Sequence, residues 1–513
     1  MNLPITDISE EPYSDRIGSD NTSAVLNATV YPPDYKMQPY EEELSIREIK
    51  TMFPGSTIVS ASPMVVEGIK EKDLPKLKRL TYAKRAVVGD REFYIDQYLL
   101  ESDTADRDQK NTRYSTHGIH RYKGKFNPQI SSHLLNIIGA DSGTRVLETF
   151  CGSGTTVLEC AHHGIAATGV DINPLAVLIT NTKLQSLSID TADARMAFDR
   201  MMRSFEKPNT DDSPRSDFLR KWLPPETFDA AEYIKEYTEQ LDSPVKELIR
   251  LTASNQFINY SNQRPFASAM QVRKTPLPKA PYMKAVEKEF DRTLKRIDYY
   301  QHLGMPTETE NRALCGDITE LSEDIGTFDC ALGSPPYTTA IPYIGRLRIS
   351  LVWLDLAEPD GINRLESSLI GSINEKGIDF EHLSTETDEM LERLPDTVSA
   401  LISEISGALR PEDDIRKQMI PHYISRYFDS MRRMFISVHK LVEGEGKFKL
   451  VVGANEVKIR RYIYIDAPKL LSNVAAECGW DLEGLPILQT FPKQGKGPNA
   501  IDLERIIELK RSG

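Results

Sequence analysis

The tetrapeptide Ser334-Pro335-Pro336-Tyr337 follows a short apolar run, FDCALG, at residues 328–333. Because proline lacks an N–H and fixes φ, the tetrapeptide cannot continue a strand, and it forms a rigid projection where the strand ends. A serine hydroxyl and a carbonyl held by the prolines can accept both N–H bonds of an exocyclic amine, while the tyrosine ring stacks on a flat heterocycle. This arrangement aims the amine at an electrophile. A plain turn is the alternative.

A second stretch, VLETFCGSGTT at residues 146–156, reads as a strand, a glycine turn and the start of a helix. Gly152 and Gly154 allow a ligand to approach the backbone closely, and Asp171 ends the next strand, where a carboxylate accepts hydrogen bonds from ribose hydroxyls. Thr155 takes the place after Gly154 and the third glycine of the dinucleotide fingerprint is absent, which favours a nucleoside without phosphate. The alternative is a tight strand–helix turn.

Asp317 lies in the segment CGDITEL at residues 315–321, just past another short apolar run. A carboxylate at this place can accept a hydrogen bond from an adenine amino group. Aspartate is also favoured as the N-cap of a helix, and that interpretation stays open.

The segment THGIHRYKGKFNPQI at residues 116–130 mixes basic and aromatic residues, a combination that suits contact with phosphates and bases. Two histidines three positions apart have no further Cys or His nearby, so we expect no metal site. A solvated basic loop is the alternative. The residues concerned are His117, His120, Arg121, Tyr122, Lys123, Lys125 and Phe126.

Strands and helices alternate from about residue 113, which predicts an α/β fold with a doubly wound, mostly parallel Rossmann-like sheet. Residues 1–45 are polar and acidic, and we expect a mobile tail there. The expected regions are an N-terminal extension of unknown role (1–112), a first part of the sheet domain (113–189), a helical insertion (190–310) and a second part of the sheet domain (311–513) with a helical insertion near 374–415.

The inserted stretch 261–300 carries nine Lys or Arg against four Asp or Glu, although the whole chain has a formal net charge of −13. A local basic surface of this kind attracts a polyanion. We therefore predict that Arg273, Lys274 and Lys279 lie on nucleic acid. A solvated helix face is the alternative.

The totals for the 513 residues, 40% hydrophobic and 27% charged, indicate a globular protein. No apolar run approaches the ~18 residues that would span a bilayer, so we expect no membrane partner. The N-terminus is acidic and does not resemble a signal peptide. The five cysteines show no CxxC spacing, which predicts reduced thiols in a cytoplasmic protein without a metal.

The order FCGSG, GVD, GD and SPPY resembles that of the amino-methyltransferases of DNA, which use S-adenosylmethionine as cofactor. The segment before the first strand looks like the part of that family that closes over the methionine end of the cofactor. The family usually has Asp-Pro before the phenylalanine, where this chain has Glu148-Thr149. The resemblance implies a base pocket at Ser334, Pro335, Pro336 and Tyr337, and cofactor contacts from Lys125, Phe126, Glu148, Phe150, Gly152, Gly154, Thr155, Asp171 (ribose) and Asp317 (adenine).

The positions of the cysteines indicate which atom of the base accepts the methyl group. Methylation of cytosine C5 needs a thiolate that adds to the ring, usually in a Pro-Cys pair, and no cysteine here follows a proline. The sequence therefore favours an exocyclic amine as the methyl acceptor. The resemblance implies a DNA methyltransferase, as in restriction-modification, with cytosine N4 preferred because the Ser-Pro-Pro-Tyr form is commonest among the cytosine-N4 members. Arg121 and Lys123 are expected to contact DNA. The alternatives are adenine N6, a tRNA guanine N2, and a non-catalytic nucleic-acid-binding module.

Overall fold

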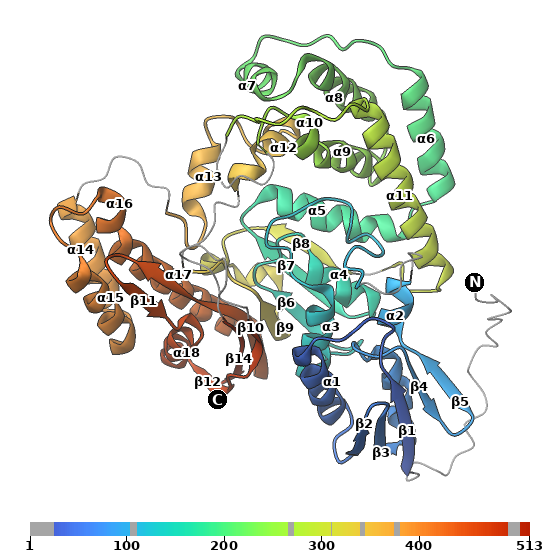
Figure 1. Cartoon of the computed structure of the whole chain (residues 1–513), viewed down its shortest axis with the longest axis vertical. Helices are drawn as coiled ribbons and strands as arrows, with labels where there is room; N and C mark the ends of the chain where they lie inside the picture. Colours follow the sequence, from blue (N-terminus) through green and yellow to red (C-terminus); the bar gives the residue numbers. More distant parts are fainter. Residues whose placement is uncertain are drawn as a thin grey trace.

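The computed structural model describes residues 25–102, 110–264, 271–308, 310–338, 344–373, 380–490 and 503–513. A nine-stranded sheet lies at its centre (Figure 1), with the strand order β12-β14-β10-β9-β6-β7-β8, while β11 pairs with β10 and β13 with β14. Its strands are β6 (Arg145–Glu148), β7 (Ala166–Asp171), β8 (Arg312–Cys315), β9 (Phe328–Gly333), β10 (Val442–Lys458), β11 (Tyr462–Ile465), β12 (Trp480–Gly484), β13 (Ile487–Thr490) and β14 (Leu503–Arg511).

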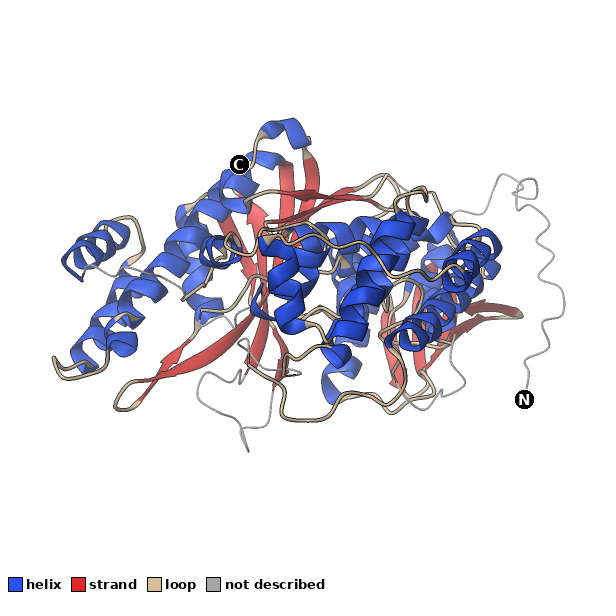
Figure 2. Cartoon of the chain, turned by 90° about the horizontal axis from the view of Figure 1, so that it is seen from above, coloured by secondary structure: helices blue, strands red, loops and turns tan. Residues whose placement is uncertain are grey.

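Helices cover both faces of this sheet (Figure 2). On one face lie α3 (Pro128–Ile138), α4 (Thr155–His162) and α5 (Pro174–Gln185), and on the other lie α17 (Ile420–Leu441) and α18 (Ala467–Glu477). Val146 of β6 packs in the core of the first face, and its neighbour Leu147 packs in the core with α17 and α18. Apolar residues at successive positions are required because a parallel strand is buried on both faces. The expected doubly wound α/β fold is confirmed.

The strand order changes direction at β6. β6 pairs in parallel with β7, which follows it in the chain, and also with β9, which follows β8. Ligands of open α/β sheets bind outside the carboxyl ends of the strands at such a switch point. The carboxyl ends of β6 and β9 carry the two motifs that the sequence singles out.

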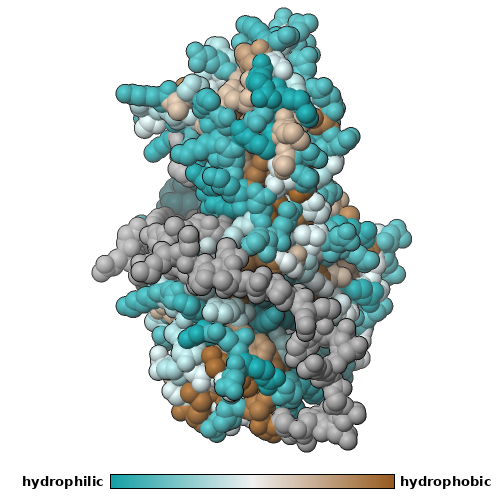
Figure 3. Space-filling model, turned by 90° about the vertical axis from the view of Figure 1, so that its right-hand side faces the viewer, coloured by the Kyte–Doolittle hydropathy of each residue, from teal (hydrophilic) through white to brown (hydrophobic). Residues whose placement is uncertain are grey.

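A helical region lies above this sheet edge in Figure 1. Its buried side chains form one apolar core together with α5, which fixes the region on the sheet. The side of it that faces the viewer in Figure 3 is mostly hydrophilic. Its helices are α6 (Thr191–Arg203), α7 (Pro214–Trp222), α8 (Pro225–Thr238), α9 (Val245–Asn255), α10 (Phe257–Tyr260), α11 (Tyr282–His302), α12 (Arg348–Trp353) and α13 (Ile362–Ser368).

A second group of helices packs against α17 on the other side of the molecule. These are α14 (Phe380–Leu391), α15 (Asp396–Ala408) and α16 (Ile415–Gln418). No helix in the described ranges is both long and apolar enough to cross a membrane.

The N-terminal part of the chain is a separate antiparallel sheet with the order β2-β3-β1-β4-β5. Its central strand is β1, so the expectation of a mobile tail over residues 1–45 is wrong from Val25 onward; residues 1–24 lie outside the described residues. The elements are β1 (Val25–Tyr31), α1 (Pro39–Met52), β2 (Thr57–Ala61), β3 (Met64–Lys70), β4 (Arg85–Val88), β5 (Arg91–Tyr94) and α2 (Asp96–Glu101).

The N-terminal sheet is joined to the central sheet through α1. Leu44 of α1 packs in the same core as α3 and α4, and Arg47 forms an ion pair with Glu508 of β14. Apolar side chains gather on the lower part of the surface in Figure 3, and Val25 and Val59 of this sheet are exposed. The polar composition of residues 1–45 concealed a strand whose inward side chains, such as Ala28 and Val30, are buried.

Candidate active site at the carboxyl ends of the central strands

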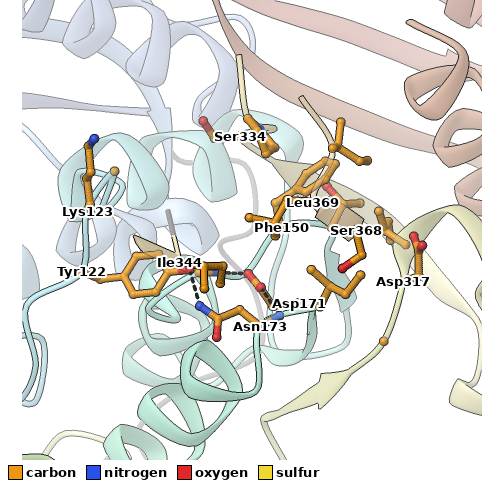
Figure 4. A pocket seen from close by; sticks show the side chains of 18 residues that line it. Tyr122, Lys123, Phe150, Asp171, Asn173, Asp317, Ser334, Ile344, Ser368 and Leu369 are labelled. Atoms are coloured by element: carbon orange, nitrogen blue, oxygen red, sulfur yellow. Dashed lines mark hydrogen bonds between the residues drawn. The ribbon is translucent and has the colours of Figure 1, made fainter. Parts of the chain in front are cut away.

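A cavity of about 100 Å³ opens at the carboxyl ends of β6, β7, β8 and β9. We call it the cofactor cavity, after the ligand that the sequence leads us to expect there. In Figure 4, Phe150, Asp171 and Ser334 surround the same space, with Tyr122 and Asp317 on opposite sides of it. The lining residues are Tyr122, Lys123, Gly124, Thr149, Phe150, Gly152, Asp171, Ile172, Asn173, Gly316, Asp317, Ile318, Ser334, Pro336, Ile344, Ser368, Leu369 and Ile370.

Asp171 is held by main-chain N–H groups at the end of β7. The Gly152 N–H donates to its Oδ2 at 2.8 Å, and the Asn173 N–H donates to its Oδ1 at 2.9 Å (Figure 4). Desolvation raises the pKa of Asp171 to about 6, and the two N–H bonds act in the opposite direction. Each carboxylate oxygen retains a second lone pair, so the carboxylate can still accept a hydrogen bond from a ligand hydroxyl.

The glycine turn after β6 needs its glycines for two different reasons. Gly152 has a φ of +50°, and a Cβ there would lie 3.4 Å from the Tyr122 ring, which covers the turn. Gly154 has a φ of +75°, and its Cβ would lie 2.5 Å from Thr180 of α5. A side chain at residue 154 would therefore push α5 and the turn apart. Gly154 does not line the cofactor cavity but determines the position of the turn that does.

Asp317 is an N-cap, as one interpretation of its motif has it, and its contact with an adenine stays a prediction. It lines the cofactor cavity, and its Oδ1 accepts the Thr319 N–H at 2.9 Å as the N-cap of a 3-10 helix at Ile318–Glu320. The cap fixes the carboxylate at the cavity wall, because one of its oxygens is bound to the backbone.

Glu148 ends β6 one strand away from Asp171 but does not line the cofactor cavity. Only 4% of it is exposed. Burial raises its pKa to about 8, against hydrogen bonds from the Thr156 side chain and the Phe150 backbone. Glu148 is thus mainly a neutral acid at pH 7 with hydrogen bonds to the turn and to the start of α4, and its contact with the cofactor stays a prediction.

The segment before α3 covers the cavity with other residues than we expected. Tyr122, Lys123 and Gly124 line it, and the Tyr122 hydroxyl accepts a hydrogen bond from the Asn173 amide at 3.3 Å. Lys125 instead donates to the Thr112 carbonyl at 2.5 Å, and burial lowers its pKa to about 7.

Two further residues expected to contact the cofactor also stand away from the cavity. Phe126 packs against the core of α3 and α4. The Thr155 hydroxyl donates to the Phe126 carbonyl at 3.4 Å, and neither residue lines the cavity. These two residues connect the segment to the first turn of α4.

The two histidines of this segment are buried, so it is not a solvated loop. His117 lies 2.7 Å from Oε1 of Glu159 in α4, the Tyr114 hydroxyl donates to the same oxygen at 2.7 Å, and the Ser132 hydroxyl donates to Oε2 at 2.5 Å. His117, Glu159 and His162 are close enough together to ligate a metal ion. The hydrogen bonds to Glu159 already account for the cluster as a polar core that anchors the segment.

The Ser-Pro-Pro-Tyr segment begins where β9 ends, at Gly333. Ser334 and Pro336 line the cofactor cavity, and Pro335 is buried. A Cβ at Gly333 would lie 2.1 Å from the Thr149 hydroxyl oxygen, so the ends of β6 and β9 are in direct contact.

Tyr337 does not line the cofactor cavity. Its hydroxyl donates to Oε1 of Glu504 in β14 at 2.6 Å, and Gln489 of β13 donates to the other oxygen of Glu504. The next residue, Thr338, is buried. Its hydroxyl donates to the side-chain oxygen of Asn455 in β10 at 2.8 Å. Residues far along the chain therefore fix this segment, and no motif in the sequence indicates them.

The residues predicted to bind nucleic acid fall into two groups. Arg121 is exposed and Lys123 is half-buried, and both lie beside the cofactor cavity. Lys274 and Lys279 are exposed in the connection before α11. Arg273 instead donates to the Ser261 and Ile258 carbonyls, both at 2.8 Å, so it holds the fold of that connection.

Several residues that line the cavity were missed in the sequence. Asn173 and Gly316 are neighbours of the predicted aspartates and follow from them once the strands are placed. Ile344 and the segment Ser368–Ile370 come from the region around α13. They carry no recognisable pattern, because only the packing of α13 brings them to the sheet edge.

Comparison with known proteins supports the resemblance, although no family model matches the chain. The chain is 41% identical over 81 residues to the Type II methyltransferase M.MjaII of Methanocaldococcus jannaschii, over 16% of this chain and 15% of that protein. It is 26% identical over 293 residues to M.MvaI of Kocuria varians, over 52% and 64%. It is 22% identical over 407 residues to M.AvaI of Nostoc sp., over 74% and 80%.

The first two matches cover less than two thirds of the relatives' own length. Among solved structures, TrmN from Thermus thermophilus aligns with 95% of this chain and 100% of its own, at 9% identity and a TM-score of 0.31, which is too low to support an argument. The chain is thus similar to Type II methyltransferases, and the resemblance to DNA amino-methyltransferases that its motifs indicate is confirmed to that extent.

Proposed function

We propose that this protein transfers a methyl group from S-adenosylmethionine to an exocyclic amino group in DNA, with cytosine N4 as the preferred acceptor. One observation carries the proposal: Ser334 and Pro336, at the end of β9, line the same cavity as Gly152, Asp171 and Asp317. The similarity to Type II methyltransferases supports DNA as the substrate. A single cavity can then hold the methyl donor beside the acceptor.

The residues of the cofactor cavity fit S-adenosylmethionine. Gly152 and Tyr122 line the cavity, Asp171 presents a fixed carboxylate to ribose hydroxyls, and Asp317 presents one to an adenine. When bound, the cofactor supplies an activated methyl group on a sulfonium. The absence of a third glycine agrees with a ligand that has no pyrophosphate.

The Ser334 hydroxyl and the Pro335 carbonyl are the groups we assign to the acceptor amine. When both N–H groups of the amine are bound by acceptors, the nitrogen lone pair is directed out of the ring plane toward the methyl donor. The amine can then attack the methyl group directly, and no covalent enzyme intermediate is needed. Cys151, in the turn after β6, is buried, and burial raises the pKa of its thiol well above its ordinary value. It is therefore not available as a nucleophile.

The target base has to leave the DNA duplex to reach Ser334. We assign recognition of the target to residues 190–310, because α6–α11 pack on α5 next to the cofactor cavity. The exposed Lys274 and Lys279 add positive charge to this region. DNA phosphates would contact these two residues, while Arg273 holds the loop that carries them.

The test is methyl transfer from labelled S-adenosylmethionine to unmethylated genomic DNA, with tRNA in parallel and the product nucleosides identified. We expect N4-methylcytosine. N6-methyladenine would retain the mechanism and overturn the preferred base. Label on tRNA alone, or on neither nucleic acid, would overturn the proposal.

A pair of serine variants tests whether the Ser334 hydroxyl binds the acceptor amine. Ser334→Ala removes one acceptor of the amine, and we expect kcat to fall about tenfold, as for a lost hydrogen bond. Ser368→Ala removes another hydroxyl from the wall of the same cavity, and kcat should stay within about twofold. Equal losses in the two variants would contradict the role of Ser334.

A further inference from the structure

A second cavity of about 220 Å³ lies beside the cofactor cavity, and Tyr122 and Lys123 line both. Three segments far apart in the chain form it: the segment before α3, the end of α9 with the turn after α10, and the start of α12. We call it the basic cavity. Its lining residues are His120, Arg121, Tyr122, Lys123, Ser254, Asn255, Phe257, Ile258, Gln263, Arg264, Arg346, Leu347, Ile349 and Ser350.

The charge of the basic cavity has one sign. Arg121, Lys123, Arg264 and Arg346 line it, and no Asp or Glu is among the described residues that do. Burial, and then the charge of Arg346, lower the pKa of Lys123 to about 8, while Glu366 acts in the opposite direction. This concentration of positive charge contrasts with the net charge of −13 of the whole chain. An anion in the cavity would relieve the repulsion between these cations.

Hydrogen bonds hold the walls of the basic cavity in place. His120 lies 3.1 Å from the Ser254 hydroxyl, and the Arg121 N–H donates to the Asn255 side chain at 2.9 Å. Arg264 is oriented by Gln271, which its guanidinium contacts at 3.0 Å. The first two bonds connect the segment before α3 to the helical region, and the third fixes the side chain of Arg264, so the walls of the cavity are in place before any ligand arrives.

We propose that the basic cavity binds the sugar and phosphate of the nucleotide that adjoins the target base in the DNA strand. The inference rests on the proposed function and names the part of the substrate that lies outside the cofactor cavity. A base turned into the cofactor cavity at Ser334 brings its own backbone to the mouth of that cavity. The neighbouring phosphate then needs a cationic site next to the shared wall of Tyr122 and Lys123.

Arginine suits this role because its guanidinium binds a phosphate through two parallel hydrogen bonds. Arg264 comes from the helical region and Arg346 from the segment that follows the Ser-Pro-Pro-Tyr motif. A phosphate bound between them would connect target recognition to the catalytic segment. Figure 4 shows Lys123 at the edge of the cofactor cavity, with its amino group directed away from Asp171.

The first experiment measures how the affinity for a labelled DNA duplex depends on salt. The variant is Arg264→Gln with Arg346→Gln, and the control is Arg410→Gln with Arg416→Gln, two exposed arginines at the ends of the α15–α16 connection. Each neutralised phosphate contributes about 0.9 to the slope of log affinity against log salt, so we expect the cavity variant, which loses one phosphate contact, to lose about 1 unit and the control none. Calorimetric binding of S-adenosylmethionine checks that both variants are folded.

An unchanged slope in the cavity variant, or an equal loss in the control, would overturn the inference. These binding measurements do not depend on methyl transfer. A failure of the proposed function, seen as wild-type protein that methylates no DNA, is therefore distinguished from a failure of the inference.

A second experiment locates the phosphate. The substrates are unmethylated duplexes that contain the site which the protein methylates. The phosphodiester linkages on either side of the target base are replaced one at a time by neutral methylphosphonates. In the wild type, we expect one replacement to raise KM about tenfold, and in the cavity variant the same replacement should have less than about a twofold effect. Equal effects in both proteins would place the phosphate outside the basic cavity and overturn the inference.

Discussion

The two sides of the cofactor cavity are built in different ways. On the side of β6 and β7, Gly152 and Asn173 hold Asp171 through main-chain bonds within one short stretch of chain. On the side of β9, the segment that begins at Ser334 is held by Glu504 and Asn455, from strands much later in the chain. Local geometry determines the first side and tertiary packing determines the second, so substitutions in the two should fail for different reasons.

The largest effect is expected from Gly154→Ala on the cofactor side. Gly154 and Gly164 both have positive φ, +75° and +63°, but a Cβ at Gly154 would collide with Thr180, and one at Gly164 would meet nothing within 4 Å. Both variants pay the strain of a left-handed residue, roughly 1–2 kcal/mol. Only Gly154→Ala should displace the turn, and we expect it to weaken S-adenosylmethionine binding about 100-fold in calorimetry.

Gly164→Ala is the control for backbone strain. Its affinity for S-adenosylmethionine should stay within about twofold of the wild type, while urea unfolding shows a loss of roughly 1 kcal/mol. If both variants lost affinity equally, strain alone would explain the effect and the close approach of α5 to the turn would not matter.

A smaller effect is expected on the β9 side, from Tyr337. If its ring stacks on the target base, Tyr337→Ala should lower kcat/KM by about 10- to 100-fold, the usual range for loss of a stacked base. Tyr337→Phe keeps the ring and removes only the bond to Glu504, so it should retain activity within about threefold. Steady-state kinetics on DNA measure both.

The opposite pattern would be equally informative about Tyr337. A loss in Tyr337→Phe as large as in Tyr337→Ala would show that the hydroxyl bond to Glu504, and with it the connection to β14, is the contribution of this residue. The β9 side would then depend on tertiary contacts even more than the comparison implies.

The smallest effect is expected at Glu148, at the end of β6, and it concerns how the stability of the protein depends on pH. Its pKa is raised from 4.5 to about 8, so the folded state binds a proton that the unfolded state has lost. Stability should therefore fall as the pH rises from about 4.5 to 8. Glu148→Gln cannot ionise, and its stability relative to the wild type should grow by up to about 1 kcal/mol per pH unit in this window.

Urea unfolding of the wild type and Glu148→Gln at several pH values between 5 and 8 measures this difference. S-adenosylmethionine binding at pH 7 should be nearly the same in both proteins, because Glu148 is mainly neutral there. Parallel stability curves would contradict the raised pKa, and a large loss of binding would return Glu148 to the cofactor site.

The contrast between the two sides also explains which parts of the fold and of the cavity could be predicted from the sequence. The α/β fold was predictable because short strands such as β6 and β9 carry apolar residues at successive positions, Val146-Leu147 and Cys330–Leu332, between turns. Gly152, Asp171 and Asp317 were predictable because each follows such a strand and strands of this kind end at one edge. Ser334 and Pro336 were predictable for the same reason.

The remainder depended on distant contacts. Tyr122 and Lys123 line the cavity and Lys125 and Phe126 do not, which the sequence did not indicate because a loop sequence does not show which side chains turn toward α3 and α4. Nothing around Glu504 indicates that it binds Tyr337. Arg273 belongs to a basic stretch, and only the structure shows that backbone carbonyls occupy its guanidinium.

The pairing of β6 with β9 has a consequence for the order in which the protein folds. Val146 pairs with Cys330, so the two strands cannot meet until β7, β8 and the α6–α11 helices between them have been synthesised. Contacts between residues so far apart in the chain form slowly, because a long loop must close first. During synthesis, the β6–β7 side can assemble early, while the cavity is completed only when β8 and β9 join the sheet. A nascent chain would thus form the wall of the cavity at Gly152 and Asp171 before the walls at Asp317 and Ser334.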